Sequence, residues 1–161
     1  MTADQTFGVL PPGAYSDEDG LTALRGVIAG RHPAATIART LGFTLSEADE
    51  GRAVFRGTPS GEVLNPHGTV HGGWAAAILD SAMGCAVHAA LRAGEAYTTL
   101  EMKLNYVRPI APDAGEVVCE GRLIHRGARI ATAEGRLVDG RGKLLAHGTE
   151  TCLIFPARGG G

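Results

Sequence analysis

The stretch Asn65-Pro-His-Gly-Thr-Val-His-Gly-Gly-Trp-Ala-Ala-Ala-Ile-Leu-Asp80 decides the fold, because a polar, glycine-rich loop leads directly into a long apolar run. From Trp74 to about Leu91 the sequence is rich in alanine and contains no proline, which predicts a helix of roughly 27 Å. The run is apolar nearly all round, as is typical of a helix inside a core, and its small side chains allow a sheet to wrap closely around it. Asp80 is the one acid in this run, and a carboxylate in such surroundings requires a reason.

Strand patterns flank this helix on both sides. Residues 36–46 and 51–58 alternate polar and apolar side chains and predict an antiparallel pair. After the helix, four alternating runs separated by turns predict strands at residues 97–107, 116–125, 129–138 and 143–155. Because strands and helices do not alternate as parallel crossovers require, this order predicts an α+β fold, a long antiparallel sheet of about six strands around one central helix at 74–91. A short N-terminal helix is predicted at Leu21 to Gly30.

The length of the chain bounds its organisation. Its 161 residues are the size of one domain and leave no room for a second core. We expect residues 1–35 to form an N-terminal arm with the short helix, residues 36–156 to form the single domain, and residues 157–161 to form a flexible tail.

Composition argues against several classes of function. Charged residues make up 20% of the chain and the net charge is -2, so neither nucleic acid nor a membrane is expected as a partner. The three cysteines lie far apart without a CxxC pair, which fits a reducing compartment rather than a disulfide framework. The N-terminus has no basic leader, and no run approaches the ~18 apolar residues of a membrane span. These features predict a soluble, cytoplasmic protein.

No metal or cofactor is expected. His67 and His71 form an H-x3-H pair, but Gly68 lies between them and no third ligand is nearby, which argues against zinc. The sequence contains neither GxGxxG nor GxxxxGK, the glycine-rich loops that cradle the phosphates of nucleotides.

Several residues together resemble a known family. Asn65, the His71-Gly72-Gly73 motif, Asp80, Tyr97-Thr98-Thr99 and the segment 105–109 are similar to the hotdog-fold acyl-CoA thioesterases of the PaaI type, from phenylacetate degradation. The resemblance covers residues 36 to 155. It implies hydrolysis of acyl-CoA to a free acid and CoA, with CoA as part of the substrate and no separate cofactor.

Gly72 and Gly73 stand where a thioesterase needs hydrogen-bond donors. The first N–H groups of a helix have no intrahelical partner, so one of them can bind the negative charge that develops on a thioester oxygen. Glycine also lets the substrate approach closely. The alternative interpretation is that both glycines only fit a tight turn into the helix.

Asp80 is the candidate catalytic acid. It can act as a general base toward water or as a nucleophile that forms an acyl anhydride, and the sequence leaves both routes open. The alternative is an acid on a wet helix face or paired with an arginine. The surrounding alanines, isoleucine and leucine leave few wet faces, which favours the catalytic interpretation.

The spacing of Gly72 and Asp80 predicts shared sites. On one helix they are separated by about 12 Å along the axis, too far for both to reach one carbonyl. The resemblance implies that Asn65, His71 and Gly72 of one subunit face Asp80 of the other. We therefore predict a homodimer, with two equal sites, and a homotetramer built as a dimer of dimers.

Supporting roles are assigned to residues on either side of the helix. The resemblance gives Asn65 the task of holding the attacking water or the carbonyl, although an Asn before a proline is also typical of a turn. His71 is assigned a supporting donor role. Thr98 and Thr99 are both candidates for holding the water beside Asp80. Strand parity favours Thr98, whereas the resemblance favours Thr99, which we prefer. A bulge at the start of the strand would reconcile the two arguments.

Three arginines, Arg108, Arg126 and Arg129, are candidates for binding the CoA phosphates, although each can equally be a solvated charge. Two other functions remain open alongside the hydrolase. One is a hotdog acyl dehydratase or hydratase, and the other is a non-catalytic acyl-CoA binding module, in which Asp80 would be dispensable. The acyl group itself is not determined by the sequence.

Overall fold

The computed structural model describes residues 5–10 and 17–157, so parts of the predicted arm and tail lie outside the described residues. The helices are α1 (Gly20–Ile28), α2 (Thr36–Leu41) and α3 (Gly72–His88), with a short 3-10 helix η1 (Gly61–Val63). The strands are β1 (Phe43–Asp49), β2 (Arg52–Gly57), β3 (Glu95–Tyr106), β4 (Val117–Arg126), β5 (Ile130–Val138) and β6 (Leu144–Pro156).

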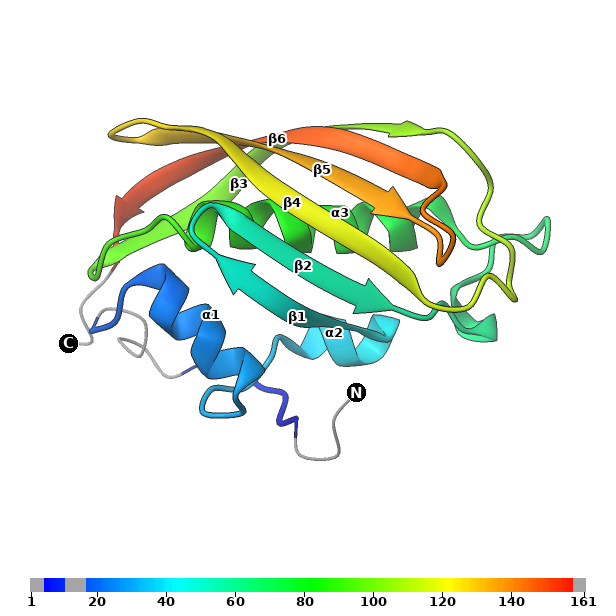
Figure 1. The fold of residues 1–161 in the computed structure, drawn as a ribbon, viewed down its shortest axis with the longest axis horizontal. Helices are drawn as coiled ribbons and strands as arrows, with labels where there is room; N and C mark the ends of the chain where they lie inside the picture. The colour runs from blue at the N-terminus through cyan, green and yellow to red at the C-terminus, as the bar shows by residue number, and fades with distance from the viewer. Residues whose placement is uncertain (1–4, 11–16, 158–161) are drawn as a thin grey trace.

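The six strands form one antiparallel sheet in the order β1-β2-β4-β5-β6-β3. The sheet curves over α3, which lies along its concave face (Figure 1). Ile78, Leu79, Ala82 and Met83 of α3 are fully buried there, so the core lies between helix and sheet. This is the predicted α+β hotdog arrangement. It leaves β1 and β3 as the two edge strands.

A row of three glycines crosses the sheet, and two of them let α3 lie close to it. Gly121, Gly135 and Gly148 are paired in register on β4, β5 and β6. A Cβ atom on Gly121 would lie 2.1 Å from the carbonyl oxygen of Ala82, and one on Gly135 would lie 2.8 Å from Cγ of Met83. The backbone of α3 therefore approaches β4 more closely than a side chain at Gly121 would permit, whereas a Cβ on Gly148 would meet Leu104 of β3.

One predicted strand was wrong at its start. Residues 36–41 form α2 rather than the first half of a strand, and β1 begins at Phe43. Gly42 ends the helix in the left-handed conformation, with φ of 71°, and donates its N–H to the carbonyl of Ala38. Because α2 is a six-residue helix with one buried side chain, Ala38, its pattern is too short to be told from a strand by periodicity.

The predicted short helix is confirmed as α1, which covers β1 and the end of α3. Gly20 donates its N–H to the carbonyl of Leu91 at 3.0 Å. A Cβ on Gly20 would lie 1.7 Å from the carbonyl oxygen of His88, so only glycine fits this junction. Leu24 of α1 belongs to the core cluster. No helix in the described residues is long and apolar enough to span a membrane.

Candidate active site

His71 begins the central helix. Its backbone is extended, and its Nδ1 accepts the N–H of Gly73 at 2.8 Å as an N-cap. In a neutral ring this bond places the proton on Nε2, which leaves an N–H donor on the exposed side of the imidazole. Because the cap uses the N–H of Gly73, Gly72 is the better placed of the two glycines to donate to a substrate. Binding by Gly73 stays a prediction.

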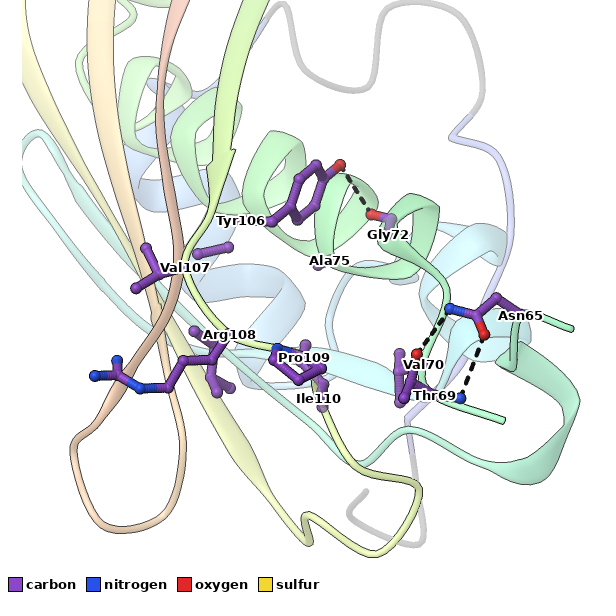
Figure 2. A pocket seen from close by; sticks show the side chains of 12 residues that line it. Asn65, Thr69, Val70, Gly72, Ala75, Tyr106, Val107, Arg108, Pro109 and Ile110 are labelled. Atoms are coloured by element: carbon purple, nitrogen blue, oxygen red, sulfur yellow. Dashed lines mark hydrogen bonds between the residues drawn. The ribbon is translucent and has the colours of Figure 1, made fainter. Parts of the chain in front are cut away.

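A cavity of about 270 Å³ lies beside this helix start (Figure 2). Gly72 and Asn65 lie on its wall together with Tyr106 at the end of β3 and Arg108 just beyond it. The Tyr106 hydroxyl donates to the carbonyl of Gly72 at 3.2 Å. A side chain on Gly72 would place its Cβ 3.3 Å from the Tyr106 ring, so glycine keeps this entrance open.

Asn65 closes the loop that precedes the helix. Its Oδ1 accepts the N–H groups of His67 and Thr69. Its Nδ2 donates to the Thr69 hydroxyl at 2.8 Å, and Figure 2 shows the two bonds to Thr69. The turn interpretation of Asn65 is therefore present in the fold. Its amide also lines the cavity beside Gly72, so a contact with substrate stays a prediction.

Asp80 lies further along α3 and contacts β3. The Thr99 hydroxyl lies 3.2 Å from Oδ1 of Asp80. The bulge expected at the start of this strand is present, because the register with β6 shifts between Thr99 and Glu101. Leu100 is the extra residue and is 57% exposed, while Thr99 before it and Met102 after it both face the helix. Tyr97 and Thr99 both line the cavity beside Asp80, so Thr98 between them lies on the opposite face of the strand, although both threonines are exposed.

Glu150 joins this cluster from β6. Its side chain is 2% exposed, and its Oε1 lies 3.0 Å from the Thr99 hydroxyl and 2.9 Å from Sγ of Cys152. Burial and the nearby charge of Asp80 raise the pKa of Glu150 to about 7. Glu150 is absent from the site residues predicted by sequence. The sequence contains a pattern that could have identified it, because alternation along β6 places Glu150 on the buried side of the strand with Gly148 and Cys152.

A second cavity, of about 220 Å³, opens beside Asp80 and Thr99. Tyr97, Cys85 and Ser81 complete its polar end. The rest of its wall is apolar and comes from α1, α2, β1, β2 and the segment before α2, with Leu24, Val27, Pro33, Ala34, Ala35, Ile37, Ala38, Phe43, Leu45 and Phe55. Trp74 and Met83, two large apolar residues of α3, are buried in the core and do not line this cavity.

The two cavities have no lining residue in common. Gly72 borders the first and Asp80 borders the second. Their spacing on one continuous helix is about 12 Å along the axis. Within one chain, the helix-start donor and the acid therefore do not meet at a common point.

The three arginines differ in their surroundings. Arg108 borders the first cavity and donates to the carbonyl of Leu144 at 2.6 Å. Arg126 is 20% exposed and forms an ion pair with Glu95, which holds the pKa of that carboxyl below its usual value. Arg129 is exposed at the β4–β5 turn. Phosphate binding stays a prediction for all three. Arg126 would have to leave Glu95 to do so.

In the described part of the chain, no three His, Cys, Asp or Glu side chains are grouped so that they could hold a metal ion. The polar side chains on the cavity walls include Asp80 and Thr99 at one cavity and Asn65, Tyr106 and Arg108 at the other.

Comparison with known proteins places this arrangement in a family. Residues 67–146 match the model of the thioesterase superfamily. A candidate esterase of Halobacterium salinarum is 30% identical over 119 residues, covering 70% of this chain and 76% of that protein. A candidate thioesterase of Ralstonia eutropha, related to phenylacetic acid degradation, superposes with a TM-score of 0.74 at 31% identity, covering 81% of this chain and 98% of that one. A mutant of the phenylacetic acid degradation protein PaaI of Thermus thermophilus gives 0.66 at 30% identity, covering 73% and 96%. The chain therefore belongs to the thioesterase superfamily and is similar to its PaaI-type, hotdog-fold members.

Proposed function

We propose that this protein hydrolyses acyl-CoA thioesters in sites that two copies of the chain share. The observation that carries the proposal is a hydrogen bond beside a largely apolar cavity. It joins Asp80, an acid on the central helix, to the hydroxyl of Thr99. The similarity to PaaI-type thioesterases supports the same reaction.

Asp80 activates water or attacks the thioester carbonyl itself. Its carboxylate borders the second cavity, where Thr99 holds it by a hydrogen bond. The same hydroxyl can orient a water molecule for attack when Asp80 acts as a general base. If Asp80 is the nucleophile, the water attacks an acyl anhydride in a second step.

The helix start binds the carbonyl oxygen. The N–H of Gly72 is in the first turn of α3 and has no intrahelical acceptor, and the positive end of the helix dipole lies behind it. His71 supports this position with its cap on Gly73 and its free Nε2–H. Together these donors would stabilise the negative charge that forms on the oxygen during attack.

A second copy of the chain brings the two halves together. Strand β3 is an edge strand, and Leu100, Tyr106 and Val107 along it are exposed large apolar side chains. Antiparallel pairing of two β3 edges about a twofold axis would cover these side chains and satisfy the open backbone groups. The two α3 helices would then run in opposite directions, so that Gly72 of one copy faces Asp80 of the other. A homotetramer would be a pair of such dimers.

The two cavities suggest how each part of the substrate binds. The apolar cavity beside Asp80 suits an alkyl or aryl acyl group. Arg108, on the wall of the first cavity, is placed for the CoA portion, and Arg129 is an exposed cation available to its phosphates.

The experiment is release of free thiol from a panel of acyl-CoAs by the wild type and by Asp80→Asn. Wild-type turnover is expected, with kcat at least about a hundredfold lower in the variant. Equal sedimentation behaviour and thermal unfolding show that both proteins are folded. Turnover that persists in Asp80→Asn contradicts the role of Asp80. Binding of acyl-CoA without any turnover supports a binding module instead, and hydration of an enoyl-CoA supports a hydratase.

A further inference from the structure

Glu150 is an acid that the proposed hydrolysis does not use. Among the residues that the structure describes, it is the only buried charged side chain. It projects from β6 toward α3, and its Oε1 contacts Thr99 and Cys152. Its Oε2 is buried without a hydrogen-bond partner. A carboxylate in this state is costly, whereas a neutral carboxyl group tolerates the same surroundings.

The groups that face Glu150 supply no compensating positive charge. In the described residues Glu150 takes part in no ion pair. The elements packed around it contribute only acidic, weakly acidic or uncharged groups: Asp80 and Cys85 from α3, Tyr97 and Thr99 from β3, Cys152 from β6, and Ala131 and Ala133 from β5. Asp80 and Glu150 lie on either side of one hydroxyl, so their carboxyl oxygens are at most about 6 Å apart. Ionisation of both acids would place two like charges close together, one of them on the almost fully buried side chain of Glu150.

The hydrogen bonds lead to the same conclusion. The Thr99 hydroxyl has one proton but lies near two carboxyl oxygens, Asp80 Oδ1 at 3.2 Å and Glu150 Oε1 at 3.0 Å. Two carboxylates would compete for that proton. If Glu150 is protonated on Oε1, it donates to Thr99 Oγ1, and the threonine proton is then free to point to Asp80.

We propose that Glu150 is a positioning residue, which in its protonated form donates to Thr99 and so directs the Thr99 proton onto Asp80. No covalent step is involved. The effect on hydrolysis rests on the proposed function, because it acts through the Asp80 and Thr99 of that site. The hydrogen-bond chain itself exists whether or not the protein hydrolyses a thioester.

The hydrogen bonds that run from Glu150 through Thr99 to Asp80 make the site sensitive to pH. Burial, followed by the charge of Asp80, raises the pKa of Glu150 to about 7, so the protonated form dominates below this pH and is lost above it. Once ionised, Glu150 attracts the Thr99 proton away from Asp80 and adds a second negative charge where an oxyanion must form. Hydrolysis should therefore slow as the pH rises through about 7.

The first test compares pH profiles of kcat for the wild type, Glu150→Gln and Glu150→Leu. Between about pH 6 and about pH 8.5 the wild type should lose about tenfold in kcat, whereas Glu150→Gln, neutral and with an amide donor for Thr99, should stay within about twofold of its value at the lower pH. Glu150→Leu has no donor and should be about tenfold slower than Glu150→Gln at both ends, with KM within about twofold. Identical profiles for wild type and Glu150→Gln would overturn the proposal.

The second test does not need activity. The carbonyl stretch of a protonated carboxyl group, followed by infrared difference spectroscopy of wild type against Glu150→Gln, should disappear as the pH rises through about 7. Asp80→Asn removes the neighbouring charge and should move this loss to lower pH, whereas Thr149→Val, on the outer face of β6, should not. A Glu150 that titrates at its ordinary value, or is unaffected by Asp80→Asn, contradicts the proposal. This result is independent of turnover. If the protein has no thioesterase activity, the proposed function is overturned, but the infrared measurement still decides whether the hydrogen bonds from Glu150 through Thr99 to Asp80 exist.

Discussion

Gly72 and Asp80 lie on one continuous helix but border two cavities that share no residue. If each functional site combines Gly72 of one subunit with Asp80 of its partner, two inactive variants should complement each other. Asp80→Asn removes the acid, and Gly72→Pro removes the N–H donor at a position where helices accept proline. Mixed dimers formed from equal amounts should recover about a quarter of wild-type activity, since half of the dimers are mixed and each contains one intact site.

The control for this experiment is a pair of variants in the same half of the site. Asp80 and Thr99 contact each other within one chain, so Asp80→Asn mixed with Thr99→Val should show no activity beyond that of the two variants measured separately. Sites formed within single chains would give no recovery from either mixture, and that outcome would contradict the shared-site model.

The bulge at Leu100 leads to a second prediction, because it decides which of two adjacent threonines reaches the helix. Thr99→Val should lower kcat about ten- to a hundredfold, since Asp80 loses the hydroxyl that holds it and orients water. Thr98→Val, on the outward face of the strand, should change kcat by less than about threefold. Steady-state kinetics on a single acyl-CoA measure both. A larger effect from Thr98→Val would mean that the bulge is placed wrongly.

Periodicity predicted the main features of the fold from sequence, because a long apolar run or a regular alternation is compatible with few kinds of secondary structure. The central helix begins two residues before its predicted start, since His71 caps it and Gly72 enters its first turn. The strands after it match their predicted ranges closely. Helix α2 was missed because six residues with one buried side chain contain less than two turns of pattern.

The site was harder to predict because contacts between distant segments determine it. Strand parity alone gave the wrong orientation for Thr98 and Thr99, since a bulge changes the parity without leaving a mark in the residues. Glu150 is 51 positions from Thr99 in sequence, and their contact depends on the pairing of β3 with β6. Local motifs such as HGG, by contrast, contain their own geometry, and for this reason the helix start was predictable to within two residues, although the cap by His71 was not predicted.

His71 combines a structural and a chemical role, and substitutions can separate them. His71→Ala removes the cap on Gly73 and should lower the free energy of unfolding by about 1 kcal/mol, together with activity. His71→Asn should restore the cap, because asparagine is a good N-cap residue, but it replaces the outward Nε2–H. Thermal unfolding should therefore recover in His71→Asn while kcat stays low. Full recovery of kcat would show that capping is the entire contribution of His71.

The apolar cavity beside Asp80 should determine acyl preference. Ala35 is an exposed residue on its wall, so Ala35→Leu can narrow the cavity without disturbing the core. We expect kcat/KM for long or aryl acyl-CoAs to fall about tenfold while acetyl-CoA changes by less than about twofold. Thr40→Leu, on α2 but outside the cavity wall, is the matched control. An equal loss for all acyl groups would place the acyl chain elsewhere.

Glu150 should also make the stability of the fold depend on pH. Its pKa is raised from the ordinary value of 4.5 to about 7 by burial and by the charge of Asp80, so the folded state holds a proton that the unfolded chain releases. The stabilising effect of this proton is complete below about pH 4.5 and is lost as the pH rises through about 7. Glu150→Gln does not titrate at this position. Relative to the variant, the wild type should therefore lose up to about 3 kcal/mol of unfolding free energy across this range.

Denaturant unfolding of both proteins at fixed protein concentration, in steps from about pH 4.5 to about pH 8, measures this difference. Groups far from Glu150 contribute equally in the two proteins, so their contributions cancel in the comparison. A difference that stays constant with pH would mean that Glu150 is ionised in the folded state throughout. The carboxylate would then need a compensating donor for Oε2, and Thr99 would have to give its proton to Glu150 rather than to Asp80.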